Sequence, residues 1–182
     1  MLEIIAFCCG ALVMVLEMVG ARVLAPHVGT SAVVWTSLIG VVLACLAVGA
    51  WLGGRLADRH LSRRGLAFIL TGAALGSALA AGTHRLVGET LSVAITDIHL
   101  AAVACALGIL ALPALCCGMI SPYIIRLRIR DVATSGATVG RLYALSTAGS
   151  IVGTFLGGFV LISFFASGTI LWGVALGLLL IL

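Results

Sequence analysis

The chain has 182 residues, of which 63% are hydrophobic and 9% charged, and its mean hydropathy is +1.32. Soluble domains carry roughly 25% charged residues, so this composition excludes an ordinary soluble enzyme or binding domain. The net charge is +4, and all ten basic residues are arginines in short stretches without interleaved aromatic residues. That distribution argues against nucleic-acid binding and favours contact with a lipid bilayer and its anionic headgroups.

Apolar runs of transmembrane length recur along the whole chain. A bilayer core about 30 Å thick takes roughly 20 helical residues, and continuous apolar runs exclude the alternating pattern of barrel strands. We therefore predict an all-α integral membrane protein that forms a single domain over residues 1–182. The six predicted transmembrane helices span residues 4–24, 31–53, 65–82, 100–123, 142–165 and 166–182. The first is expected to be a retained helix, because its start lacks the basic residues of a signal peptide.

Two features limit what else the chain holds. The longest stretches outside the predicted helices, 83–99 and 126–140, are too short to fold as domains, so no soluble catalytic module fits and we predict no enzyme activity. We expect 83–99 to be a loop rather than an interfacial helix. Because the sequence stops inside apolar residues at Leu182, helix 166–182 is barely long enough to cross, and a truncated natural chain is one interpretation.

The arginines predict the orientation. Translocated loops are poor in basic residues, so the two arginine-rich loops are expected in the cytoplasm, together with both chain termini. Only Arg22 and Arg85 then lie toward the outer side. The eight predicted cytoplasmic arginines are Arg55, Arg59, Arg63, Arg64, Arg126, Arg128, Arg130 and Arg141.

The second helix is followed by the segment GRLADRHLSRR at 54–64. It resembles the cytoplasmic signature G-x-L-A-D-R-x-G-R-R of the major facilitator superfamily, which lies at the same place between helices two and three. In that family the aspartate contacts a helix N-terminus in the opposite half and helps to lock the outward-facing state. The resemblance implies a gating motif of Gly54, Asp58, Arg59 and Arg63, in which the arginines are charge partners of the aspartate.

The segment departs from the signature at Leu61, where the family has glycine, and at Ser62, where it has arginine. The other interpretation of Asp58 is an exposed pair with Arg55 or Arg59, which would contribute little. If the gate exists, a carboxylate at a helix N-terminus gains roughly 0.3 to 1 kcal/mol from the helix dipole.

The fifth predicted helix has glycines every four residues, which lie on one face and allow another helix to approach closely. With the preceding glycine the spacing G-x8-G-x3-G-T-x2-G-G resembles the fifth-helix motif of facilitator-superfamily antiporters, with threonine where that motif has proline. The resemblance implies export by exchange; a generic packing seam is the alternative. The motif residues are Gly140, Gly149, Gly153, Thr154, Gly157 and Gly158.

Helix 4–24 places Glu17 roughly 10 Å below its outer end, at about 1.5 Å per residue. A carboxylate at that depth is costly unless it is paired, protonated or hydrated, so we expect Glu17 to face packed helices or a cavity. One interpretation makes Glu17 a proton or cation site, with Arg22 as counter-charge or anion contact. The other is a static Glu17–Arg22 brace within or between subunits.

Helix 100–123 contains Pro113 and Pro122, which predict kinks of the sort found where helices line a cavity. No arginine lies in its middle, so the proton-coupling motif of many facilitator antiporters is absent. The six cysteines do not have zinc spacing, and we predict neither a metal nor a cofactor.

Three strings, LEMVGARVLAP at 16–26, ISPY at 120–123 and VGRLYALSTAGS at 139–150, resemble the membrane half of bacterial fused facilitator and spermidine-synthase-like proteins. The resemblance implies half of a major-facilitator bundle in the bacterial inner membrane. The aminopropyltransferase domain of that family is absent from this sequence. We therefore expect a half-size transporter, working as a homodimer that exports a small polar or cationic solute of the polyamine or amino acid class. The alternatives are a non-transporting membrane anchor for a spermidine-synthase-like enzyme and a scaffold without turnover.

Overall fold

The computed structural model describes residues 2–129 and 135–181, and within them it contains helices and no strand. The predicted all-helical fold is confirmed. The elements are α1 (Leu2–Val28), α2 (Ala32–Arg59), α3 (Arg63–Ala94), α4 (Ile98–Arg128), α5 (Ser135–Phe155), the π-helix η1 (Leu156–Leu161), α6 (Ile162–Phe164) and α7 (Ser167–Leu180). Arg130, one of the predicted cytoplasmic arginines, lies outside the described residues.

Five helices of the described chain are long and apolar enough to cross a membrane, the fifth being the continuous run Ser135–Phe164 formed by α5, η1 and α6. The predicted boundary between the last two helices is correct, because Phe165 and Ala166 have extended backbones. The last helix, α7, has 14 residues and is therefore about 21 Å long, shorter than a bilayer core of about 30 Å.

The prediction of a loop over 83–99 is wrong. Helix α3 continues to Ala94 and α4 begins at Ile98, so three residues connect them. Thr83 and Thr90 donate their hydroxyl protons to carbonyls four residues back, which satisfies these polar side chains without leaving the helix. Helix α5 likewise begins at Ser135 rather than at the predicted residue 142.

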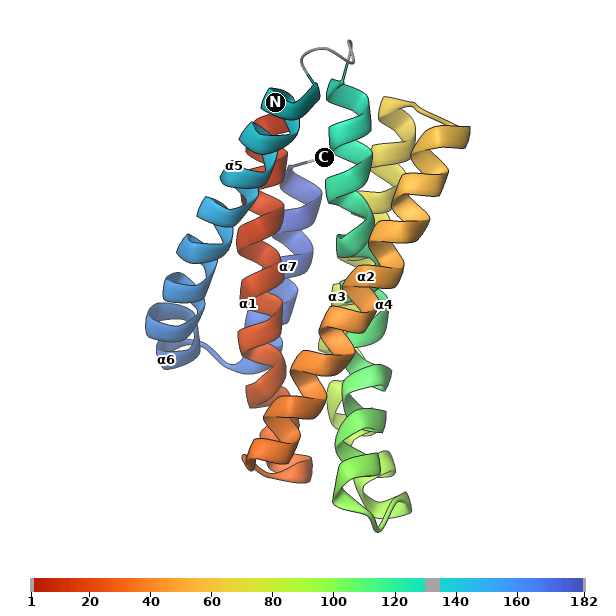
Figure 1. Cartoon of the computed structure of the whole chain (residues 1–182). Coiled ribbons are helices and arrows are strands. Elements are labelled where there is room, and N and C mark those ends of the chain that lie inside the picture. The colour runs from red at the N-terminus through yellow and green to blue at the C-terminus, as the bar shows by residue number, and fades with distance from the viewer. Residues whose placement is uncertain (1, 130–134, 182) are drawn as a thin grey trace.

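Two parallel helix pairs form the front of the bundle, α1 with α5 and α2 with α4 (Figure 1). Both pairs are packed through glycines spaced four residues apart. In the first pair, a Cβ at Gly153 would lie 2.6 Å from the Cα of Ala11. In the second pair, a Cβ at Gly53 would lie 2.6 Å from the Cα of Met119. Side chains at these positions would collide with backbone, so glycine sets the distance between the helices.

Helices α3 and α7 complete the bundle: α3 packs on α4 and α7, and α1 contacts both α4 and α7. The core between them holds fully buried side chains such as Leu16, Leu38 and Leu110. Large apolar side chains also cover the outside; Phe68 and Phe159 are each more than 70% exposed. An apolar exterior of this kind is suited to lipid rather than to water.

Both described chain ends lie at one end of the bundle (Figure 1). The same end carries the connection between α2 and α3 and the end of α4, with Arg55, Arg59, Arg63, Arg64, Arg126, Arg128 and Arg141. We call this the arginine-rich end. Which side of a membrane this end faces stays a prediction from the arginine distribution.

Tyr123 of α4 holds the α2–α3 connection at this end. Its hydroxyl donates to the carbonyl of His60 at 2.8 Å and accepts the backbone N–H of Ser62 at 3.1 Å. Ser62 in turn accepts the N–H of Gly65 at 2.9 Å and caps α3. Serine is a good N-cap, which gives Ser62 a structural role at this position.

We expect Tyr123→Phe to lower the free energy of unfolding by about 1–3 kcal/mol, because it leaves partly buried backbone groups without their partner. Tyr143→Phe is the matched control, since the Tyr143 side chain is 72% exposed. Urea unfolding in detergent measures both. Equal stability of the two variants would show that the Tyr123 hydroxyl does not hold this connection.

Candidate functional site

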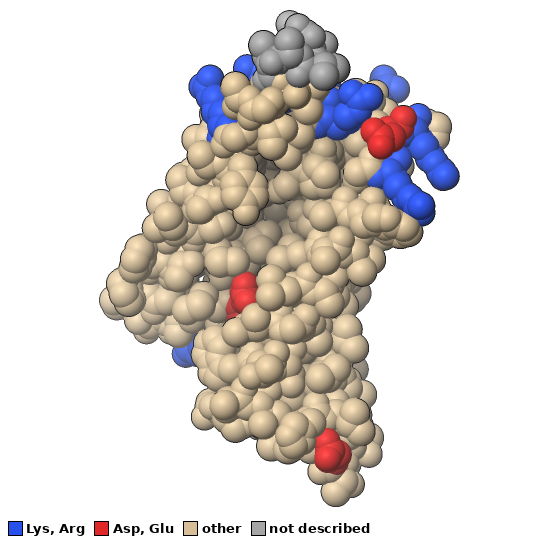
Figure 2. All heavy atoms as spheres, in the orientation of Figure 1, with Lys and Arg blue, Asp and Glu red and all other residues tan. Residues whose placement is uncertain are grey.

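Glu17 lies in the middle of α1, half-buried, and no ion pair or hydrogen bond joins its side chain to another described residue. Its helix turn packs on two sides: Gly20 contacts Leu38 and Leu110, while Met18 lies beside Gly158. Figure 2 shows most of the charged side chains of this face at the arginine-rich end, with one acidic side chain part-way along the face. Glu17 is thus a half-buried carboxyl, in the middle of a helix long enough to cross a membrane, without a partner among the described residues.

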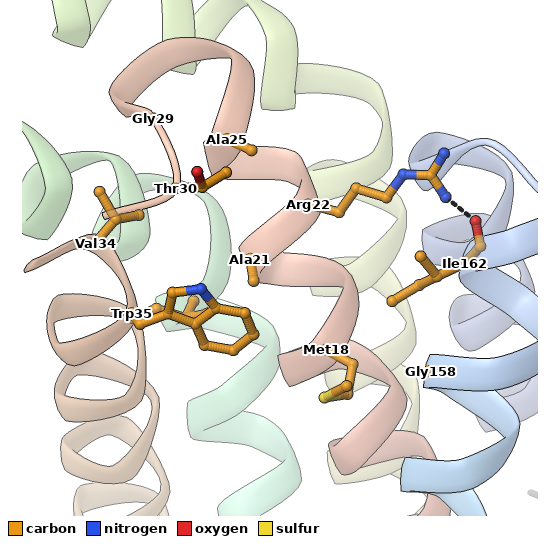
Figure 3. Close-up of a pocket in the computed structure, with 11 residues that line it drawn as sticks. Met18, Ala21, Arg22, Ala25, Gly29, Thr30, Val34, Trp35, Gly158 and Ile162 are labelled. Atoms are coloured by element: carbon orange, nitrogen blue, oxygen red, sulfur yellow. Dashed lines mark hydrogen bonds between the residues drawn. The ribbon is translucent and has the colours of Figure 1, made fainter. Parts of the chain in front are cut away.

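Arg22 does not pair with Glu17, so the brace within one subunit is wrong. Instead its guanidinium donates to the backbone carbonyls of Ile162 and, at 3.2 Å, Phe165 (Figure 3). These carbonyls end the run of α5, η1 and α6 and lack helical partners of their own. A cation at a helix C-terminus is also favoured by the helix dipole. Arg22 therefore anchors the fifth spanning helix to α1.

A cavity of about 310 Å³ lies between α1, α2 and η1, next to this anchor (Figure 3). Met18, Ala21 and Arg22 form its wall on α1, and Trp35 closes the α2 side. Arg22 is the only charged lining residue, and Glu17 is not part of the lining. Arg22 therefore borders this cavity and Glu17 does not, although the sequence grouped the two charged residues into one site.

The gating motif lies at the arginine-rich end, with Gly54, Asp58 and Arg59 on the last turns of α2 and Arg63 at the start of α3. Asp58 pairs with Arg126 of α4 at 3.2 Å, and not with Arg59 or Arg63. The prediction that Arg59 and Arg63 are the charge partners of Asp58 is therefore wrong within one chain, where the partner is Arg126. Both side chains of the pair are more than half exposed, so the pair itself adds little stability.

Sequence reasoning missed a second charge cluster at this end. Glu3 of α1 pairs with Arg128 of α4 at 3.7 Å and with Arg141 of α5 at 3.2 Å. It joins the two parallel helix pairs across the front of the bundle. The sequence did contain a clue to this cluster: among the described residues, Glu3 and Asp58 are the only acids at the arginine-rich end.

The residues of the fifth-helix motif have different surroundings. Gly149 and Gly153 pack directly on the backbone of α1, and Gly157 and Gly158 contact Val15 and Met18, whereas Gly140 has open space around it. Thr154 donates its hydroxyl proton to the carbonyl of Ser150 at 2.9 Å. Two residues after this threonine the helix widens into η1, so the local irregularity here is a π-helix in a segment without proline.

Helix α4 continues through both Pro113 and Pro122. Pro113 is buried where α3 comes closest, because a Cβ at Gly76 would lie 3.0 Å from its nitrogen. Lacking an N–H, it leaves the carbonyl of Ile109 without its usual helical donor. The predicted kinks stay predictions. Among the described residues no group of three side chains is arranged to hold a metal ion.

Asp97 caps α4 at the end of the bundle opposite the termini. Its carboxylate accepts the backbone N–H groups of His99 at 2.9 Å and Leu100 at 3.0 Å. The hydrogen bond from Leu100, followed by that from His99, lowers the pKa of Asp97.

A lowered pKa in the folded state means that the cap stabilises the fold above the ordinary pKa of aspartate, about 3.9. The contribution is lost as pH falls through the lowered value. We expect Asp97→Asn to reduce the acid sensitivity of the melting temperature below about pH 4. If the melting temperature of Asp97→Asn depended on pH as that of the wild-type protein does, the stabilising role of the Asp97 cap would be contradicted.

The fold and the apolar spans define the class: a multi-pass helical membrane protein, built from two parallel helix pairs with two further helices packed behind them. Comparison with protein-family models, with curated proteins and with solved structures finds no match. The function is therefore argued from the site alone.

Proposed function

We propose that the chain is a half-size, facilitator-like transporter that works as a homodimer and exports a small polar or cationic solute by alternating access. The solute class is a polyamine or an amino acid. In this proposal two copies face each other across the front of the bundle, where the α1–α5 and α2–α4 pairs are exposed. Each copy contributes one Glu17 to a shared central cavity.

The observation that carries the proposal is the state of Glu17. A carboxyl at membrane depth is unfavourable by several kcal/mol unless something compensates it, and no described side chain does. A purely structural acid would be expected to have a partner such as Arg22, but Arg22 is used by backbone carbonyls. A cationic solute or a proton supplies the missing compensation and gives the residue a reason to be there.

The cytoplasmic gate follows from the same arrangement. The Asp58–Arg126 and Glu3–Arg141 pairs are solvent-accessible and weak, so they can exchange partners as the two halves move. In the dimer each Asp58 reaches toward the partner's α5 near Gly140, which lies after the first turn of the helix and has open space around it. Disulfide trapping between cysteines at positions 58 and 140 is expected to give covalent dimers. Exclusively intramolecular products would contradict this arrangement.

Flux measurement tests the transport function itself. Purified protein in proteoliposomes is expected to move a radiolabelled polyamine or basic amino acid faster than protein-free liposomes do, and a pH gradient is expected to change the rate. If a verified dimer moves none of these solutes, the anchor of a spermidine-synthase-like enzyme becomes the better account. Co-purification of such an enzyme would then be the next observation to seek.

A further inference from the structure

We propose that the end of the bundle opposite the termini contains a binding site for a phosphate group. A cavity of about 600 Å³ opens there between α1, α3 and the start of α7. Of its 11 lining residues, five are ionisable: Arg22, His27, His84, Arg85 and Glu89. No other described cavity brings together so many charged or titratable side chains.

The charge of the cavity favours an anion. The lining contains two arginines and one glutamate, so its formal charge is positive even with both histidines neutral. Arg85 has no ion pair or hydrogen bond with any described residue, although Glu89 is one helix turn away. Its guanidinium is therefore free to bind a ligand, and guanidinium is well suited to phosphate oxygens.

Both imidazoles pack beside glycines of neighbouring helices. The ring of His27 lies against Gly88 of α3, where a Cβ would overlap it, with the ring Cγ only 2.6 Å away. The Nδ1 of His84 hydrogen-bonds the carbonyl of Ala81 at 3.0 Å, and a Cβ at Gly168 of α7 would lie 3.4 Å from its Cε1. With its Nδ1–H donating to that carbonyl, the His84 ring donates from Nε2 to a phosphate oxygen when it is protonated.

Hydrogen-bond donors approach from three elements, which favours a tetrahedral phosphate over a planar carboxylate. Arginine and histidine come from α1 and α3, and the hydroxyls of Ser167 and Thr169 come from α7. One bidentate arginine satisfies a carboxylate, whereas phosphate oxygens accept from several directions. His84 also lies 21 residues along α3 from Arg63, about 32 Å, which is the depth of a lipid headgroup if α3 spans the bilayer.

The phosphate can come from solution or from a lipid headgroup, and titration calorimetry separates the two. The full chain is kept in dodecyl maltoside, a detergent without phosphate, and titrated with inorganic phosphate and separately with dihexanoyl-phosphatidylglycerol. Binding of the lipid alone identifies a headgroup site, and binding of inorganic phosphate identifies a site open to free anions. Either result supports the proposal.

Variants show whether binding occurs in this cavity. Arg85→Gln and His84→Gln are each expected to weaken binding at least tenfold, and Gly88→Ala to weaken it by displacing His27 without removing a charge. His99→Gln is the matched control, because His99 lies at the same end outside the cavity; its effect should be less than twofold. Arg22 is left intact because it anchors α6. Absence of binding by both probes, or equal binding in Arg85→Gln and His84→Gln, would overturn the site.

The site does not depend on the proposed transport, because it lies apart from Glu17 and its test needs no flux. Each proposal can fail while the other stands.

Discussion

Replacing Gly53 by alanine is expected to destabilise the protein, whereas the same replacement at the neighbouring Gly54 is expected to be neutral or stabilising. A Cβ at Gly53 would lie 2.5 Å from the carbonyl oxygen of Met119 and 2.6 Å from its Cα. Because both of these Met119 atoms belong to the backbone, α2 and α4 must move apart to admit the alanine. Overpacking of this kind costs about 1–3 kcal/mol. At Gly54 nothing lies within 4 Å, and alanine gains up to about 1 kcal/mol in helix propensity.

The α1–α5 pair offers a parallel test. Gly153→Ala is expected to destabilise the protein, as Gly53→Ala does. Gly140 lies on the same helix but in open space, so Gly140→Ala is expected to be neutral or stabilising, as Gly54→Ala is. Unfolding by denaturant in detergent micelles compares the four variants directly. If all four had the same stability, the close packing of the two helix pairs would be contradicted.

The second large effect is expected on transport. Glu17→Gln removes the charge and the exchangeable proton at nearly constant volume, so solute flux should fall at least tenfold while the protein stays folded. The physical reason is that an amide cannot compensate a cation or carry a proton. Proteoliposome flux with and without a pH gradient measures the effect.

Asp97→Asn is the matched control for Glu17→Gln, because it makes the same chemical change at an exposed helix cap, at the end of the bundle opposite the termini. Its flux should equal that of the wild-type protein at neutral pH. Flux that survives in Glu17→Gln, or is lost equally in both variants, would remove Glu17 from the mechanism.

The spans could be predicted from the sequence because their signal is local. Apolar runs of about 20 residues predict the helices. The predicted boundary between residues 165 and 166 agrees with the structure, where Phe165 has an extended backbone. The extension of α3 to Ala94 was missed because residues 83–94 look polar enough for a loop. Polar residues of this stretch fit within the helix because hydroxyls such as that of Thr83 donate to backbone carbonyls of the same helix.

The partners of charged residues could be predicted much less well. Asp58 pairs with Arg126, which is 68 positions away, although Arg59 is adjacent to it. Arg22 was expected beside Glu17, but it binds carbonyls that become available only where the fifth spanning helix ends. Such partners depend on how the helices pack, and the sequence pattern of a single helix does not include that information.

The proposed transport requires Glu17 to be an uncompensated carboxyl that the transported solute reaches. A membrane-permeant carbodiimide, applied to flux-competent proteoliposomes, modifies such a carboxyl, and mass spectrometry locates the modified residue. We expect that Glu17 is modified, that flux falls in proportion, and that an excess of transported solute protects both the residue and the flux. Unimpaired flux after complete modification of Glu17, or modification that solute does not slow, would show that Glu17 is not the residue that the solute reaches.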